Sequence, residues 1–255
     1  MKERMMTLYI TDTLCAMTGV LPVTLRNWRR AGLVPHVRNS KGIYSRSDYT
    51  RVLQVLDLTN AGDTLPEIYQ LLNDPYHYRR SGWQCRTEEV LTQLNQASAE
   101  SLNRLIQALG TNYGGEAFIN SLLRPLNLWL RSDVGPGASL RLARFHTAVL
   151  RHADRMMALS EKQKCVPVFL EAASTTDDTE IWLETIRLIG QGCRVELSAE
   201  VTDIPAKPTR KYEHHLIWCG AGLSAGMKKH YIRKLAQDYP VMLCGTNTQA
   251  CLTPA

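Results

Sequence analysis

The stretch "LPVTLRNWRR", from Leu21 to Arg30, decides how the first part of the chain folds. A proline in the first turn of a helix loses no hydrogen bond, because its missing N–H would have no partner there. Gly32 and Pro35 follow directly, and such residues are typical of the end of a helix. At about 100° per residue, apolar side chains gather on one face of this helix: Leu21, Leu25 and Trp28.

The opposite face of the same helix carries Arg26, Asn27 and Arg30. A second short helix is predicted upstream, over Asp12–Met17, and it ends at a turn that contains Gly19. Two short helices joined by a tight turn form a helix-turn-helix, whose second helix enters the major groove of DNA. Guanidinium groups suit that role because they offer paired hydrogen bonds to phosphate or guanine. By itself, a basic face of this kind is more often an ordinary solvated surface, and the DNA-binding interpretation depends on the segments that follow.

The next segment extends the pattern. "PHVRNSKGIYS" places an Asn-Ser-Lys-Gly turn between two short extended pieces, 37–38 and 43–44, which is long enough for a two-stranded wing. Ser45 with Asp48, and Thr64 with Glu67, have the spacing of capping boxes. They predict one helix that runs to about Asn60 and another over residues 65–72. The predicted order is therefore helix, helix, wing, helix, helix.

In this order, "LYITDTLCAMTGVLPVTLRNWRRAGLVP" and "KGIYSRSDYTRVLQVLDLTNAGDTLPEIYQLL" resemble the DNA-binding domain of the MerR family of bacterial regulators. The resemblance implies a winged helix-turn-helix over residues 1–74. Gly42 stands where the family's wing usually has arginine, so Lys41 or Arg38 is expected to make the wing's phosphate contact. The residues expected to contact DNA are Thr24, Arg26, Asn27, Arg30, Arg38, Lys41 and Tyr44.

The rest of the chain divides into a helical and a mixed segment. Apolar residues recur at helical spacing over 87–95, 99–109, 116–131 and 139–160, which predicts a four-helix bundle within residues 84–162. After Lys164, the short apolar runs "VPVFLEA", "RVELS", "HLIWCG" and "PVMLC" alternate with helical stretches over 178–191 and 225–237. This alternation predicts a parallel α/β domain over residues 163–255. The fold class is therefore mainly α with α/β.

A bundle followed by a small α/β unit resembles the flavodoxin-like cobalamin-binding module of MerR-type light sensors. The segments "LLRPLNLWL", "TEIWLE" and "IWCG" are closer to the family's cobalamin-independent, MlrA/BluR-like branch. Cobalamin binders carry an axial histidine after the first strand, but "EAASTTDDTE" contains none. His146 is interpreted as a bundle histidine. We therefore expect a degenerate cobalamin-binding-like domain with no cofactor.

Other chemistries have weaker signals. The turn "CGAGLSAG" could cradle a nucleotide phosphate through Gly220–Gly226, but it follows the third predicted strand and not the first. Two histidines and three cysteines near the C-terminus lack the paired spacing of a zinc site: His214, His215, Cys219, Cys244 and Cys251. No nucleophile and base can be placed together from the sequence. We expect neither a metal site nor catalysis, although a small-molecule or nucleotide sensor remains an alternative for this half.

The whole chain suits this interpretation. It has 255 residues, a formal net charge of +6 and a pI of about 9.0, which favours acidic partners. Seven scattered cysteines and the polar start MKERMM indicate reduced thiols and a cytoplasmic location. The expected partners are operator DNA, a second copy of the chain, RNA polymerase at the promoter and a regulatory protein on the C-terminal half.

Overall fold

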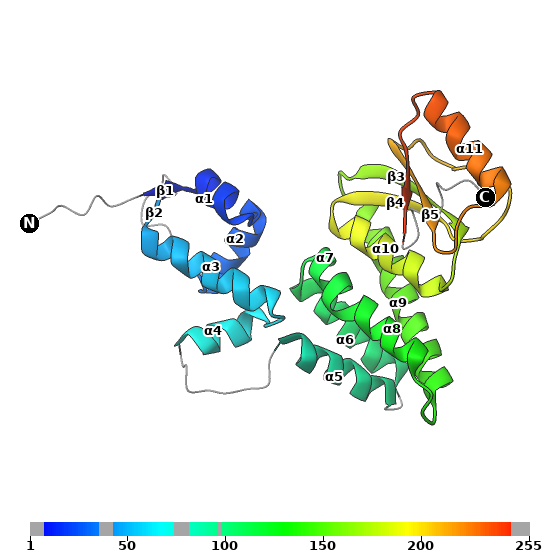
Figure 1. Cartoon of the computed structure of the whole chain (residues 1–255). Helices are drawn as coiled ribbons and strands as arrows, with labels where there is room; N and C mark the ends of the chain where they lie inside the picture. Colours follow the sequence, from blue (N-terminus) through cyan, green and yellow to red (C-terminus); the bar gives the residue numbers. More distant parts are fainter. Residues whose placement is uncertain (1–7, 36–42, 74–81, 96–97, 246–255) are drawn as a thin grey trace, which may run out of the picture. The chain divides into compact units, whose positions relative to one another are not determined.

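The computed structural model describes residues 8–35, 43–73, 82–95 and 98–245. The chain forms two compact units, Met1–Glu89 and Val90–Ala255, which are drawn together in Figure 1 and are described separately below. The predicted division into three domains stays a prediction. Within the described ranges, no helix is both long enough and apolar enough to cross a membrane.

The first unit contains the predicted helices. Its elements are β1 (Tyr9–Ile10), α1 (Thr11–Thr18), α2 (Pro22–Arg30), β2 (Ile43–Tyr44), α3 (Arg46–Asn60) and α4 (Leu65–Asn73). The sequence did not predict β1, which pairs antiparallel with β2 through Tyr9 opposite Tyr44 and Ile10 opposite Ile43. The other predicted strand of the wing, residues 37–38, lies outside the described residues.

Helix α2 ends in a Schellman motif, which explains the glycine at position 32. The Gly32 N–H donates to the Arg29 carbonyl at 3.0 Å, and the Leu33 N–H donates to the Trp28 carbonyl at 3.0 Å. This geometry needs a left-handed residue, and Gly32 adopts φ +73°. Leu33 and Trp28 are both buried, so the apolar contact that usually accompanies the motif is present.

Side-chain caps start the next two helices as predicted. The Ser45 N–H donates to Asp48 Oδ2 at 2.8 Å, and the Asp48 N–H donates back to Ser45 Oγ at 3.2 Å, which completes a capping box. At α4, the Thr64 N–H donates to Glu67 Oε2 at 2.7 Å. Behind these helices lies a core of fully buried side chains: Leu14, Val20, Leu25, Trp28, Leu33, Val34, Tyr44, Val52, Val55 and Ile68.

Helix α5 (Gly82–Asn95) crosses from the first unit into the second. The helices that follow are α6 (Ala99–Asn112), α7 (Gly115–Phe118), the π-helical turn η1 (Ile119–Leu123), α8 (Arg124–Ser132) and α9 (Ala138–Ser160). The prediction of one continuous α-helix over 116–131 is therefore wrong in one respect, because the π-helical turn η1 lies inside that range. That turn lies directly before Pro125, whose missing N–H leaves an upstream carbonyl without its usual α-helical donor.

The second unit also contains the predicted parallel sheet. Its elements are β3 (Val166–Ser174), α10 (Asp178–Gly190), β4 (Cys193–Ser198), β5 (His214–Cys219), α11 (Ala225–Ala236) and β6 (Val241–Cys244). The strand order is β4-β3-β5-β6, and every neighbouring pair is parallel. As expected from its irregular composition, the connection between β4 and β5 contains no helix.

Side-chain alternation along the strands gives the sheet two covered faces. On one face, Leu170 of β3 packs in a cluster with Ile181 of α10. On the other face, Ala173 of β3 and Ile217 of β5 pack in a cluster with Met227 of α11. Figure 1 shows α10 and α11 on opposite sides of the strands. The two helices therefore enclose the sheet in a three-layer arrangement.

The helical segment and the α/β segment of this unit meet at a pair of glycines. A Cβ atom placed on Gly115, at the start of α7, would lie 2.9 Å from the Cα of Gly190, at the end of α10. A Cβ placed on Gly190 would lie equally close, 2.9 Å, to the Cα of Gly115. The two helix ends therefore touch through their backbones.

Candidate nucleic-acid interface

Helix α2 has one buried face and one exposed polar face. Leu25 and Trp28 are 0% and 2% exposed and fix the helix in the core of the first unit. Arg26, Asn27 and Arg30 are exposed, as the spacing predicted. Thr24 is half-buried at the edge between the two faces. The prediction that Leu21 belongs to the buried apolar face is wrong. Leu21 precedes the first turn as the N-cap residue, and it is 63% exposed.

The exposed residues of α2 are available to a ligand. The side chains of Arg26, Asn27 and Arg30 make no hydrogen bond or ion pair to any residue that the structure describes. Binding a phosphate or a base edge would therefore break no intramolecular hydrogen bond. Since no ion pair to a described residue involves Arg26 or Arg30, the positive charge of this face favours a polyanion.

Polar contacts join the elements of the first unit around α2. Arg51 of α3 donates from Nε to the Leu33 carbonyl at 3.0 Å, directly after the helix ends. Farther along the chain, Arg86 of α5 donates to Glu67 of α4 at 2.6 Å, and the Trp83 N–H donates to the Ala61 carbonyl at 3.0 Å. The sequence analysis missed these supporting residues, because each of them bonds to a residue distant in the chain.

The predicted contacts of the wing have different outcomes. Arg38 and Lys41 lie outside the described residues, so their contacts with DNA stay predictions. Tyr44 is only 1% exposed, and its phenolic oxygen is buried without a hydrogen-bond partner among the described residues. Its ring belongs to the core of the first unit, and we do not include Tyr44 in the interface proposed below.

The second unit contains a polar joint between α8 and the start of α10, formed by Arg124, Asn127, Arg131, Asp177 and Glu180. The amide of Asn127 is fully buried and donates to Asp177 and, at 3.4 Å, to Glu180. Arg124 Nε lies 3.1 Å from Glu180 Oε2, and Arg131 Nη1 lies 3.4 Å from Asp177 Oδ2. Asp177 caps α10, through the Thr179 N–H at 2.9 Å, but it also links two layers.

A cavity of about 490 Å³ opens beside this joint, at the carboxyl ends of β3 and β4. Its lining includes Thr175 and Asp178 after β3, Trp182 of α10, Glu200 after β4 and His146 of α9. His146 Nδ1 lies 2.9 Å from the Thr179 hydroxyl. The strand ends of open α/β sheets are the usual place for ligands.

The glycine-rich turn Gly220–Gly226 is packed tightly against its own chain. A Cβ on Gly220 would lie 3.0 Å from the Ser174 carbonyl oxygen, and a Cβ on Gly226 would lie 2.9 Å from the Asp203 carbonyl oxygen. The Ala221 N–H donates to Ser174 Oγ at 3.0 Å. Close packing therefore explains these glycines without a bound nucleotide.

The described cysteines do not assemble with the histidines of β5. Cys219 is buried at the far end of that strand, and burial raises the pKa of the Cys244 thiol. His214 is exposed, and Cys251 lies outside the described residues. Cys219 is therefore a core residue of the sheet, 0% exposed.

An exposed basic helix held by a helix-turn-helix core defines the first unit as the DNA-binding domain of a transcription regulator. Three family models match the chain in succession: "MerR HTH family regulatory protein" at residues 9–74, "Transcriptional regulator MlrA, helical domain" at 83–143, and "Transcriptional regulator MlrA, C-terminal domain" at 166–241. The chain belongs to the MerR family and is an MlrA-like, DNA-binding transcription regulator.

Relatives over nearly the full length support this assignment. The HTH-type transcriptional regulator MlrA of Escherichia coli (strain K12) is 23% identical over 243 residues, which cover 94% of this chain and 100% of the relative. The protein of the same name from Salmonella typhimurium (strain SL1344) is 22% identical over 235 residues, covering 91% and 96%.

Proposed function

We propose that α2 binds the major groove of an operator and that Arg26, Asn27 and Arg30 contact base edges and phosphates, with Thr24 at the edge of the contact. The observation that supports this proposal is the exposed, unpaired polar face of α2 behind a fully buried Leu25 and Trp28. Arg38 and Lys41 of the wing would add phosphate contacts, which position the domain without reading sequence.

A binding titration with two variants tests the assignment. Arg26→Ala should weaken operator binding by about 1–3 kcal/mol and relax sequence preference if Arg26 reads a base. Lys41→Ala should weaken binding to all sequences about equally and reduce the salt slope by about 1, because a phosphate contact releases counterions.

Arg104→Ala is the matched control, since Arg104 is an exposed arginine in the second unit. Fluorescence anisotropy at two salt concentrations separates the two kinds of contact. Unchanged affinity in both the Arg26 and the Lys41 variants would show that α2 is not the recognition helix.

The regulator is proposed to act as a homodimer on a near-palindromic site at promoters used by RNA polymerase. One small domain contacts too few base pairs for high specificity, whereas two copies read two half-sites. Analytical ultracentrifugation of the complex on its operator measures the stoichiometry. One chain per operator with a single half-site footprint would contradict the proposal.

The second unit is proposed to receive a regulatory protein that changes operator affinity, without cobalamin and without catalysis, in the cytoplasm. The loop after β3 offers no histidine to ligate cobalt. A partner shifts the DNA-bound state only if it binds the two states differently. Titrating the full chain with cobalamin and following its visible absorbance tests the cofactor prediction, and a red, light-responsive complex would refute it.

The cavity of about 490 Å³ at the strand ends favours a second candidate, a sensor for a small molecule. Its mixed lining, with the Trp182 ring beside Asp178 and Glu200, suits a compact ligand that has both apolar and cationic parts. A thermal-shift screen with Trp182→Ala as the insensitive variant would identify such a ligand. A ligand that stabilises both proteins equally would bind elsewhere.

A further inference from the structure

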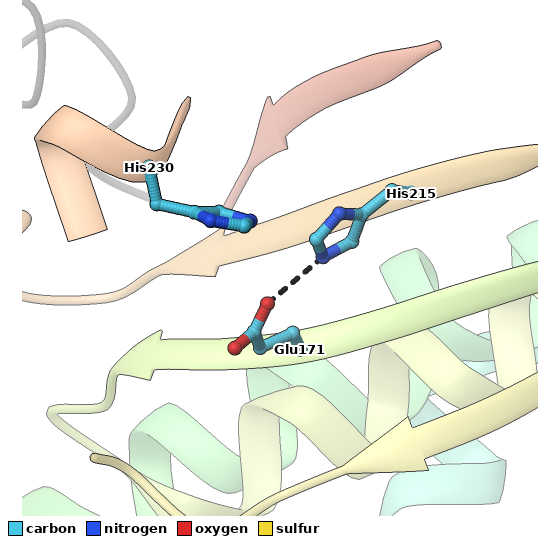
Figure 2. Close-up of side chains that lie close together, drawn as sticks. All are labelled: Glu171, His215 and His230. Carbon is cyan, nitrogen blue, oxygen red and sulfur yellow. Dashed lines mark hydrogen bonds and ion pairs between the residues drawn. The ribbon is translucent and has the colours of Figure 1, made fainter. Parts of the chain in front are cut away.

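Three potential metal ligands meet between the sheet and α11, on the sheet face that does not carry α10. They are Glu171 of β3, His215 of β5 and His230 of α11, shown in Figure 2. The β3–β5 register places Phe169 opposite His215, so His215 and Glu171 point to the same face of the sheet. One donor atom from each of the three side chains lies within 4.8 Å of the other two.

The Glu171–His215 pair is buried and oriented. His215 Nε2 lies 2.9 Å from Glu171 Oε2, and the two side chains are 2% and 3% exposed. The second carboxylate oxygen of Glu171 accepts the Ala206 N–H, which fixes the plane of the carboxyl group. His215 Nδ1 is buried without a hydrogen-bond partner among the described residues. Buried polar atoms usually have a partner, so this nitrogen has hydrogen-bonding capacity that no described residue uses.

The donor set matches the chemistry of zinc. Imidazole nitrogen and carboxylate oxygen bind Zn²⁺ at about 2.0–2.2 Å, and two histidines with one glutamate form a known three-ligand set that leaves a fourth position open. Around a tetrahedral ion, such atoms lie about 3.3–3.5 Å apart. In the structure, His215 Nε2 and Glu171 Oε2 lie 2.9 Å apart, and one donor atom of each side chain lies within 4.8 Å of the others, so an ion between them requires the side chains to adjust.

His230 is the accessible member of the group. It is half-buried on α11, and burial lowers the pKa of its imidazole, with smaller contributions from neighbouring charges. Arg233 Nη2 lies 3.2 Å from His230 Nδ1, but the arginine side chain is exposed and can rotate into solvent.

We propose that Glu171, His215 and His230 bind one Zn²⁺ ion, which fastens α11 to β3 and β5. The sequence predicted no metal site, because His214, His215 and the cysteines of this half lack the short paired spacing of a zinc site. The site instead uses two adjacent strands and a helix that come together only in the folded unit. Because it does not depend on DNA binding, its test is independent of the proposed function.

The test is a Zn²⁺ titration of the full, tag-free chain after chelator treatment, followed by calorimetry and thermal unfolding. The wild type should bind one ion in this site and unfold at a higher temperature with Zn²⁺, because a ligand that binds only the folded state stabilises it. His230→Ala should bind at least about 10-fold more weakly, the smallest loss typical even of an outer-shell partner, and should lose the thermal shift.

Two further variants make the result decisive. His214→Ala removes an exposed imidazole at the neighbouring position of β5 and should bind like the wild type. Glu171→Gln keeps the size of the side chain, removes the charge and should weaken binding. Co²⁺ in place of Zn²⁺ should give the visible absorption of a tetrahedral site in the wild type and not in His230→Ala. No stoichiometric Zn²⁺ binding by the wild type, or equal affinity in His230→Ala, would overturn the proposal.

Discussion

Asn127→Asp tests whether the polar joint between α8 and α10 depends on a neutral hydrogen-bond donor at position 127. The side chain is 0% exposed, and its amide donates to the carboxylates of Asp177 and Glu180. The substitution keeps the shape, removes both hydrogen bonds and places a third carboxyl group among two others. A hydrogen bond to a charged group contributes about 1.5–3 kcal/mol, and an uncompensated buried charge costs about 3–5 kcal/mol.

The two costs overlap, because the added carboxyl can take up a proton instead of remaining charged. We therefore expect a net loss of about 3–5 kcal/mol at pH 7. For a unit of this size, about 1 kcal/mol shifts Tm by about 2–4 °C, so Tm should fall by at least about 6 °C. The deficit should shrink as the pH falls, since the introduced carboxyl group is then neutral at less cost.

Asn120→Asp is the matched control. Asn120 is exposed on the preceding turn and accepts from Arg124 at 2.6 Å, so a carboxylate there remains solvated and paired. Its effect should stay within about 0.5 kcal/mol, as for most surface substitutions. Differential scanning calorimetry of both variants at pH 7 provides the comparison. Equal Tm values for Asn127→Asp and the wild type would refute the conclusion that the joint depends on a neutral donor.

Two other predictions concern single groups. Burial, and to a smaller extent Arg155, lowers the pKa of His152 to about 4, so the folded state resists protonation of this ring. The free energy of unfolding should therefore be highest above about pH 6.5, the pKa of an unfolded histidine, and should decrease as the pH falls toward 4. Between pH 7 and pH 4.5 this histidine should cost the wild type about 2.5 kcal/mol of unfolding free energy, measured by urea unfolding, and His152→Leu should remove that loss. An unchanged pH dependence in His152→Leu would rule this histidine out. Ser45→Ala should lower the stability of the first unit by about 1 kcal/mol through loss of the capping box, whereas Ser47→Ala, at an exposed position beside it, should have a smaller effect in the same assay.

Local signals in the sequence predicted much of the first unit. Pro22, Gly32 and the Ser45–Asp48 pair act within one or two turns of a helix, so their effect can be read without knowing the fold. Strand β1 was missed because two residues are too few to show a period, and its pairing with β2 spans the two helices between them. The burial of Tyr44 was missed for the same reason, since it depends on helices packed from elsewhere.

The second unit shows more clearly that contacts between distant segments could not be predicted from the sequence. Short apolar runs predicted all four strands, and alternation with helices predicted that they are parallel. The π-helical turn before Pro125 was missed because proline predicts a disturbance but not its form. The polar joint and the Glu171–His215–His230 group were missed because partners from separate elements meet only after folding. Chemistry that depends on tertiary contacts leaves no spacing signal.

The contact between Gly115 and Gly190 has a consequence for how this chain can vary. With 2.9 Å between a Cβ on either residue and the Cα of the other, neither position can accept even alanine unless two helices move apart. Among relatives that keep this architecture, the two positions should therefore change together or not at all. A side chain at one of them would mark proteins in which the start of α7 stands farther from the end of α10.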